Sequence, residues 1–321
     1  MLDVLTLIAM GIVLLLPLWG HNLTRPHVHD DAAELNEHLG LVSNYMLRMP
    51  WPVKMFRYFL AFMEPYFLRL GEMAVRHFGR RGFFFRGPLK IIPLLLGWVA
   101  KQFFTSEVYT CEEVEHLLRN LRRKYRFTIA TQGICPCRKA LGKYSTVLPN
   151  ATDFQILADS RIYPKIYNEY REVPVEFVIK KLRDYDLKGL VHTVFGICGV
   201  EGSEVAICNC SATVCFPLRA AIVGLFPVTP GYTFVKVEAS QCDPDCPQKA
   251  WCLKICQMRA RQIGQDGRVM VNAMKCIGCG VCRPVCPNNA NTLVERGKKY
   301  RRILPRILLE PNAPVGPRIL E

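Results

Sequence analysis

The pattern of apolar and polar positions changes several times along this chain of 321 residues. Residues 4–19 are nearly all apolar, and no Lys or Arg precedes them. A cleaved secretory signal normally has a basic start and a small-residue cleavage site. The segment therefore predicts an uncleaved membrane anchor rather than a signal peptide, with Met1 and Leu2 extending it towards the ~20 residues of a membrane span.

Two more apolar segments follow before residue 105. Residues 51–78 predict a helix with one apolar face, which Pro65 should kink or split. That face is formed by Phe56, Leu60, Met63, Phe67 and Leu70. Residues 83–104 are too short in their apolar centre, and too interrupted by proline, for a span. Both segments fit helices lying in the membrane interface; alternatively, their apolar faces pack against the rest of the chain or a partner subunit.

From Thr110 onwards the pattern becomes that of a small α/β domain, expected over residues 106–232. Thr110 and Glu113 predict a capping box for a helix at residues 111–124. A second helix is expected to begin with Pro174 in its first turn and to continue through about residue 183. Strands are expected at residues 126–134, 190–195 and 204–207.

Short elements alternate with cysteines in residues 233–296. Strands are expected at residues 234–238, 268–272 and 291–295, and a short helix at residues 253–263. Residues 297–321 are rich in proline and basic side chains, which predicts an extended basic tail.

Cysteine spacing provides the strongest chemical signal in the sequence. Cys276, Cys279, Cys282 and Cys286 form a C-x2-C-x2-C-x3-C run followed by Pro287, which is the spacing of bacterial ferredoxins that bind [4Fe–4S] clusters. Gly278 and Gly280 allow this loop to close without Cβ clashes. Four more cysteines lie upstream at Cys242, Cys246, Cys252 and Cys256. Structural zinc is the alternative, but eight thiolates arranged in two runs favour clusters.

Over residues 234–296 the chain resembles a two-cluster [4Fe–4S] ferredoxin domain. The resemblance implies crossed ligation, in which each half of the domain lends one cysteine to the cluster of the other half. The implied first cysteine set is Cys242, Cys246, Cys252 and Cys286, and the implied second cysteine set is Cys256, Cys276, Cys279 and Cys282. The upstream run departs from the family pattern in its wider spacing and in Gln257, where a proline is usual.

A further group of cysteines lies in the middle domain, at Cys135, Cys137, Cys208, Cys210 and Cys215. Each part of this group is expected at the end of a strand. Its CPCR and ICNC motifs resemble a region found ahead of the two-cluster domain in some bacterial and archaeal iron–sulfur proteins. Two interpretations remain open: a third Fe–S or other soft-metal centre, or a set of buried free thiols. Cys111 and Cys198 are interpreted as ordinary cysteines.

The expected fold class is therefore α+β with four parts. N-terminal membrane-anchoring helices occupy residues 1–105, the α/β domain residues 106–232, the ferredoxin-like two-cluster domain residues 233–296, and the tail residues 297–321. The formal charge of +15 suits anionic lipid, an acidic protein partner or nucleic acid. The predicted anchor argues against nucleic acid. Basic residues after the anchor, and the need for reduced thiolates, place most of the chain on the cytoplasmic side of the cell membrane.

The sequence contains no nucleotide-binding glycine loop and no recognisable Ser/His/Asp context. The expected function is membrane-associated electron transfer through two [4Fe–4S] clusters, to or from a partner redox subunit that carries out the catalysis. The alternative is an iron–sulfur oxidoreductase with its own metal site at the middle-domain cysteines. The expected partners are redox protein subunits and membrane lipid, with no nucleic acid.

Overall fold

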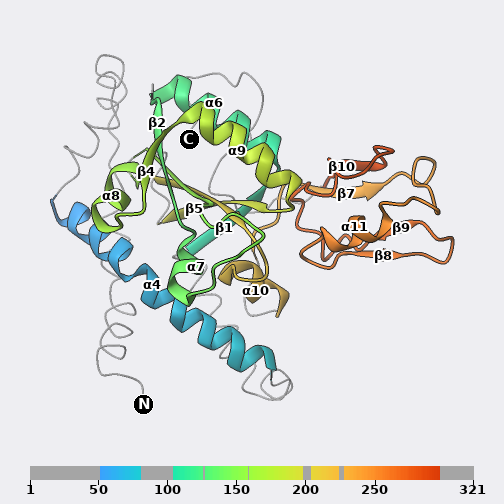
Figure 1. Ribbon diagram of the computed structural model, residues 1–321, viewed down its shortest axis with the longest axis horizontal. Coiled ribbons are helices and arrows are strands. Elements are labelled where there is room, and N and C mark those ends of the chain that lie inside the picture. The colour runs from blue at the N-terminus through green and yellow to red at the C-terminus, as the bar shows by residue number, and fades with distance from the viewer. Residues whose placement is uncertain are drawn as a thin grey trace.

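The computed structural model describes residues 51–80, 104–125, 127–157, 159–197, 204–223 and 228–296 (Figure 1). The predicted anchor at residues 4–19, residues 83–103 of the third apolar segment, Cys198 and the tail lie outside these ranges. Within the described ranges, no helix combines the length and apolar character needed to cross a membrane. The described chain has a mixed α/β fold.

A six-stranded sheet forms the centre of the middle domain, in the order β1-β5-β6-β3-β2-β4. Every pair of neighbouring strands in it is antiparallel. In that spatial order the strands are β1 (Phe104–Tyr109), β5 (Val191–Ile197), β6 (Glu204–Cys210), β3 (Asp153–Leu157), β2 (Ile129–Gly133) and β4 (Arg171–Pro174).

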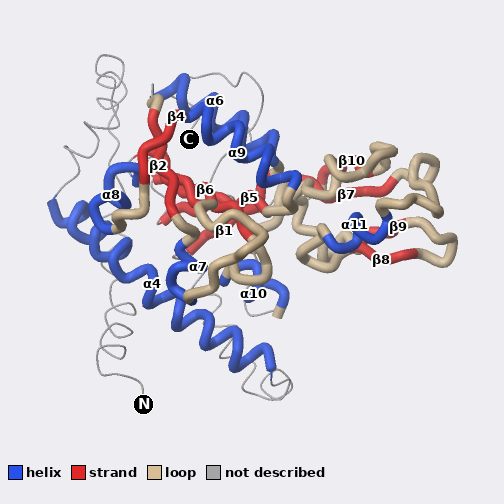
Figure 2. The backbone as a smooth tube through the Cα atoms, in the orientation of Figure 1, coloured by secondary structure: helices blue, strands red, loops and turns tan. Residues whose placement is uncertain are grey.

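Helices α6 (Cys111–Tyr125) and α9 (Val175–Leu187) cover one face of this sheet and lie side by side (Figure 2). The predicted capping box of α6 is confirmed, because the Glu113 amide donates to Thr110 Oγ1 over 3.2 Å and the Thr110 amide donates to Glu113 Oε2 over 2.8 Å. Pro174 is the N-cap of α9 rather than a first-turn residue, and this helix continues to Leu187, beyond the expected end.

Four helices lie on the opposite side of the sheet: α7 (Pro136–Leu141), α8 (Asp159–Ile166), α10 (Phe216–Ile222) and the long α4 (Trp51–Arg80). The apolar contacts of α4 join Ala61 to α8 and Val75 to α10. The helix therefore packs against the middle domain, but through Ala61 and Val75, which lie outside the apolar face predicted from the sequence.

Pro65 does not split α4, although a proline removes one helical hydrogen bond donor. The carbonyl that loses its partner is that of Ala61, four residues earlier. The Tyr167 hydroxyl donates to this carbonyl oxygen over 2.6 Å. A side chain from the middle domain therefore satisfies the acceptor that Pro65 leaves open, and α4 continues past it.

The C-terminal part of the described chain, orange to red in Figure 1, contains two small antiparallel sheets. In one, β7 (Thr233–Val237) pairs with β10 (Asn291–Glu295); in the other, β8 (Arg261–Ile263) pairs with β9 (Val269–Val271). The predicted helix at residues 253–263 is wrong, because the only helix here in the described chain, α11, ends earlier (Lys249–Lys254). Arg259 has a φ of 51°, which no α-helix accommodates, and the chain reverses there into β8.

Candidate metal centres

The loop that carries Cys276, Cys279 and Cys282 depends on two glycines in left-handed conformations. Gly278 has a φ of 74° and Gly280 a φ of 76°. A Cβ added to Gly278 would lie 2.1 Å from the carbonyl oxygen of Thr233 on β7. Only glycine can occupy that position, so the prediction that these glycines let the loop close is confirmed.

The four sulfurs of the second cysteine set lie near one another. Cys282 belongs to a buried cluster with Ile255, the residue preceding Cys256, and Cys276 and Cys279 pack against that cluster. Burial raises the pKa of the Cys282 thiol to about 12, and nearby Cys276 and Cys256 add to the effect while Arg261 opposes it. Burial, together with the other three thiols of this set, also raises the pKa of Cys279. Loss of the protons from these buried thiols requires compensating positive charge, such as bound metal provides.

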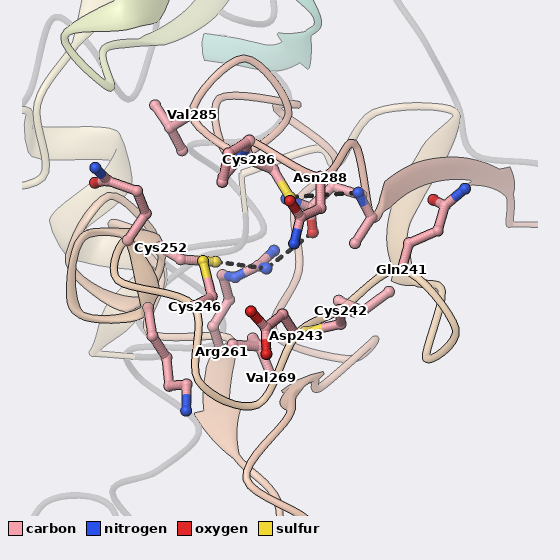
Figure 3. Close-up of a pocket in the computed structure, with 16 residues that line it drawn as sticks. Gln241, Cys242, Asp243, Cys246, Cys252, Arg261, Val269, Val285, Cys286 and Asn288 are labelled. Carbon is pink, nitrogen blue, oxygen red and sulfur yellow. Dashed lines mark hydrogen bonds between the residues drawn. The ribbon is translucent and has the colours of Figure 1, made fainter.

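All four cysteines of the first set line one pocket (Figure 3). Three of them come from the irregular upstream run, and the fourth, Cys286, comes from the other half of the domain. The wider upstream spacing is accommodated by α11, which carries Cys252 between the loop of Cys242 and Cys246 and the loop of Cys256. The structure therefore groups the eight cysteines four and four, as crossed ligation requires.

The two halves of the domain repeat one local motif around the cysteine that each half lends. Cys256 and Cys286 are each followed, four residues later, by an alanine whose amide donates to the cysteine sulfur over 3.3 Å. The residue before each alanine, Arg259 or Asn289, has a φ of 51°. Backbone N–H groups that point at a sulfur stabilise its thiolate form. Equivalent thiolates therefore receive equivalent support in the two halves.

The residue after each alanine differs between the halves, and in the first half it is a candidate site residue that the sequence did not single out. Arg261 is 9% exposed and lines the pocket of the first set. Its Nη2 lies 2.9 Å from Cys252 Sγ and 2.8 Å from Asn291 Oδ1, and Asn291 Nδ2 donates to the Cys282 carbonyl over 2.7 Å. In the described structure its Nε and Nη1 atoms are buried without a hydrogen bond partner.

From sequence alone Arg261 was one of several basic residues near the loops, and a solvated basic face explained most of them equally well. The structure separates them by burial, because Lys254, Arg259 and Lys275 are exposed while Arg261 is buried. The signal that could have revealed it is the repeat itself. Arg261 follows Cys256 at the same distance at which Asn291 follows Cys286, and both open a strand.

The five middle-domain cysteines also come together, from the N-terminus of α7, from β6 and from the N-terminus of α10. Their side chains form a continuous series of hydrogen bonds in the order Cys135, Cys137, Cys215, Cys210, Cys208. The expectation that each group follows a strand is half right. Cys135 follows β2, whereas Cys208 and Cys210 lie inside β6, which is longer than predicted because their side chains point into the buried face of the sheet.

Hydrogen bonds set opposite pKa shifts along this series. Hydrogen bonds from Cys135 and then Cys215 lower the pKa of Cys137, and those from Cys208 and Cys215 lower the pKa of Cys210. The two cysteines that β6 contributes to this series also contact polar side chains. Thr193 Oγ1 lies 3.1 Å from Cys210 Sγ, and Cys208 Sγ donates to Asp153 Oδ1 over 2.8 Å. Burial raises the pKa of Asp153 to about 6.

This group adjoins the second cysteine set. Cys210 and Cys215 belong to a buried cluster with Ile277, and Cys279 packs against that cluster. Gln257, next to Cys256, donates to the Cys210 carbonyl over 3.2 Å and accepts a hydrogen bond from the Ala212 amide. Gln257, which occupies the usual proline position, therefore joins the two cysteine groups.

All the cysteines in the described part of the chain are free, so no disulfide competes for these sulfurs. No three His, Cys, Asp or Glu side chains among the described residues converge on a point that would hold a single ion. A cubane does not require such convergence, since each of its thiolates binds a different iron atom rather than a shared one.

Comparison with known proteins identifies one part of the chain. No curated protein and no solved structure matches it. Residues 269–290, which include Cys276, Cys279, Cys282 and Cys286, match the family model of the 4Fe-4S binding domain. This segment of the chain is therefore an iron–sulfur domain of the ferredoxin type.

Proposed function

We propose that this protein transfers electrons through two [4Fe–4S] clusters, at a membrane surface, to or from a partner redox subunit. The observation that supports this most strongly is the grouping of the eight cysteines into two sets that each draw on both halves of the domain. The first set would hold one cluster and the second set the other.

The residues of the first set fit such a group. A [4Fe–4S] cluster supplies reversible one-electron transfer when bound, and its sulfides accept hydrogen bonds. Arg261 brings two buried, unpartnered nitrogen donors to the pocket that the four sulfurs line. The chain therefore offers four thiols, one cation and spare N–H donors in one place, as an anionic cluster requires.

The decisive experiment counts iron. The full-length protein, purified and reconstituted without oxygen, is expected to bind about eight irons per chain, with two interacting paramagnetic centres after reduction. Cys242→Ser and Cys276→Ser are each expected to remove about half of the iron and to leave the other centre in place. Substitution of Cys111, whose side chain is buried in the core of the middle domain, is the matched control. Retention of only about four irons in the wild-type protein would contradict a second cluster.

The proposed membrane association is supported by the outer face of α4 as well as by the apolar N-terminal segment. Four large apolar side chains on this helix are exposed by half or more of their surface: Met55, Phe62, Tyr66 and Met73. Their spacing of seven, four and seven residues places them in a single stripe. The stripe lies opposite the face that packs on the middle domain, and an apolar stripe of this kind suits the interface of a bilayer.

A vesicle assay tests the membrane proposal. Phe62→Glu combined with Met73→Glu is expected to reduce the fraction of protein bound to vesicles of anionic and zwitterionic lipid by several-fold. Val147→Glu changes a still more exposed apolar side chain elsewhere and should have no effect. Equal binding of both variants would show that the stripe has no role at the membrane.

A second candidate function, an oxidoreductase with its own metal site at the middle-domain cysteines, is favoured by one specific observation. These cysteines pack against the second set through Ile277 and Cys279, so a centre there would lie close to an electron supply. An enzyme of this kind would lose turnover when the middle-domain cysteines are replaced, yet keep both ferredoxin signals in low-temperature EPR.

A further inference from the structure

We propose that the five middle-domain cysteines provide the thiolate ligands of a third metal centre, which holds iron or zinc. This inference goes beyond the two ferredoxin clusters and rests on the proposed function only for its role in electron transfer. The ligand atoms come from Cys135, Cys137, Cys208, Cys210 and Cys215.

The first argument is the contact between the sulfurs themselves. A free cysteine in a protein interior behaves as a small apolar side chain, and it gains little from a neighbouring sulfur. Here each thiol is hydrogen bonded to at least one other, in an unbroken series across three separate segments. Sulfurs about 3.8 Å apart are what four ligands at the usual 2.3 Å from one metal require. The folding of these segments therefore concentrates thiols where packing alone would not.

The second argument is the support that the sulfurs receive from backbone donors. The Phe216 amide donates to the sulfur of Cys137, and the Arg138 amide donates to that of Cys135. The same kind of N–H···S bond supports Cys256 and Cys286 in the ferredoxin-type domain. Such donors favour the thiolate, which is the form that binds metal.

The third argument is the polar surroundings of the group. Asp153 accepts from Cys208, and it is held in turn by the Tyr170 hydroxyl over 2.5 Å and by Gln155 Nε2 over 2.6 Å. Burying a carboxylate costs free energy, and a core of free thiols gives no reason for that cost. Beside a metal ligand a buried carboxylate is common, because it orients the ligand through a hydrogen bond.

The five sulfurs do not yet surround one point. Cys276, Cys279 and Cys282, in the segment that matches the 4Fe-4S binding domain family, do not surround one point either. The lack of convergence therefore does not by itself distinguish a metal-binding cysteine group from a group of free thiols.

The position of the group gives the centre a role. Cys210 and Cys215 share a buried cluster with Ile277, which follows Cys276 of the second cysteine set, and Gln257 Nε2 donates to the Cys210 carbonyl. If the centre holds iron, it lies beside the second ferredoxin cluster and extends the path of electrons into the middle domain. If it holds zinc, it fixes β6 and α10 against that cluster.

The test is elemental analysis of the full-length protein, purified without oxygen and then reconstituted either with iron and sulfide or with zinc. Wild-type protein is expected to bind metal in excess of the about eight irons of the ferredoxin-type domain. Cys137→Ser combined with Cys210→Ser should remove only that excess. Cys111→Ser, another buried cysteine of the same domain, should leave it unchanged. Cys135→Ser combined with Cys215→Ser, which also leaves only three of the five thiols, covers the case in which the first double variant does not fold.

The metal contents of these variants distinguish failure of the third metal centre from failure of the two ferredoxin clusters. Excess iron with a third EPR signal, or excess zinc without one, supports the third centre if the excess disappears in the cysteine variants. Metal that equals the ferredoxin content in wild-type protein, or an excess that the variants retain, overturns it. Failure of the two-cluster proposal appears instead as iron that neither Cys242→Ser nor Cys276→Ser removes, or as only about four irons in the ferredoxin-type domain.

Discussion

The guanidinium of Arg261 lies 2.9 Å from Cys252 Sγ. Although burial opposes the effect, Cys282 of the other cysteine set raises the pKa of this guanidinium, as does Cys252. One buried cation therefore lies between the two candidate clusters. Because a reduced cluster is more negative than an oxidised one, this cation should favour reduction of both. Arg261→Gln is expected to lower the equilibrium constant for reduction at least tenfold, a fall of about 59 mV in potential.

The measurement is an EPR-monitored redox titration of the reconstituted protein. Arg261→Lys should restore part of the potential, since it keeps the charge and loses the planar fork. Lys254→Gln removes an exposed charge near the same loop and should shift the potential little. Equal potentials in wild-type protein and Arg261→Gln would remove Arg261 from any role in tuning.

Gly278 should be irreplaceable in the second cysteine loop. Gly278→Ala places a Cβ 2.1 Å from the Thr233 carbonyl oxygen at a φ of 74°, so the loop must open. About four irons per chain should be lost, with the first set retaining its cluster. Gly142→Ala is the control, since its φ is 61° but nothing lies within 4 Å of the added Cβ. Iron analysis and EPR of both variants decide the matter.

The hydrogen bond from Tyr167 to the Ala61 carbonyl should stabilise α4 only because Pro65 is present. Tyr167→Phe is expected to lower the free energy of unfolding by about 1–2 kcal/mol, since it leaves this buried acceptor without a donor. In the Pro65→Ala background residue 65 regains its own N–H, and Tyr167→Phe should cost less. Denaturant titration of the four proteins of this double-mutant cycle measures the coupling. Strictly additive effects would contradict the compensation.

Glu72 should make the attachment of α4 dependent on pH. Although burial alone would raise it, hydrogen bonds from Arg219 and Arg76 lower the pKa of Glu72 to about 2. A carboxylate with a depressed pKa stabilises the fold above its unfolded value near 4.5, and this contribution is lost as the pH falls towards 2. Glu72→Gln should therefore be less stable than wild type by about 2 kcal/mol at pH 7, with the difference narrowing below pH 4.5.

Urea unfolding of wild type and Glu72→Gln at pH 7 and pH 3 tests this pH dependence. The effect of acid on the other titratable groups is the same in both proteins, so it cancels when their free energies of unfolding are subtracted. Glu172→Gln, which changes an exposed carboxylate on β4, is the control and should alter the stability little at either pH. A difference for Glu72→Gln that does not change with pH would rule out the ionised carboxylate as its cause.

Local signals in the sequence were sufficient for several features. The Thr110–Glu113 capping box and strand β10 were predictable because each depends on neighbouring residues. The helix expected at residues 253–263 was wrong because the reversal at Arg259 serves the placement of Cys256, a tertiary requirement that no helical periodicity records. The continuity of α4 past Pro65 depends on Tyr167, over a hundred residues away in the chain.

The candidate centres were also predictable to different degrees, because some depend on neighbouring residues and others on tertiary structure. Spacing alone located Cys276, Cys279, Cys282 and Cys286, since these thiolates share one loop. The assembly of Cys137 with Cys210 and Cys215 depends on the sheet and on two helices, so the sequence could only leave it as one of two interpretations. Arg261 required knowledge of burial, which its basic neighbours obscured.

The proposed exchange of one cysteine between the halves has a consequence for the order of synthesis. On the ribosome, Cys256 emerges before the other members of its set, and Cys242, Cys246 and Cys252 emerge before Cys286. Neither set of cysteines is complete until nearly the whole domain has been synthesised. If the two sets bind clusters as proposed, both clusters would be completed only after this stage, and a chain truncated before Cys286 would leave its first set a ligand short.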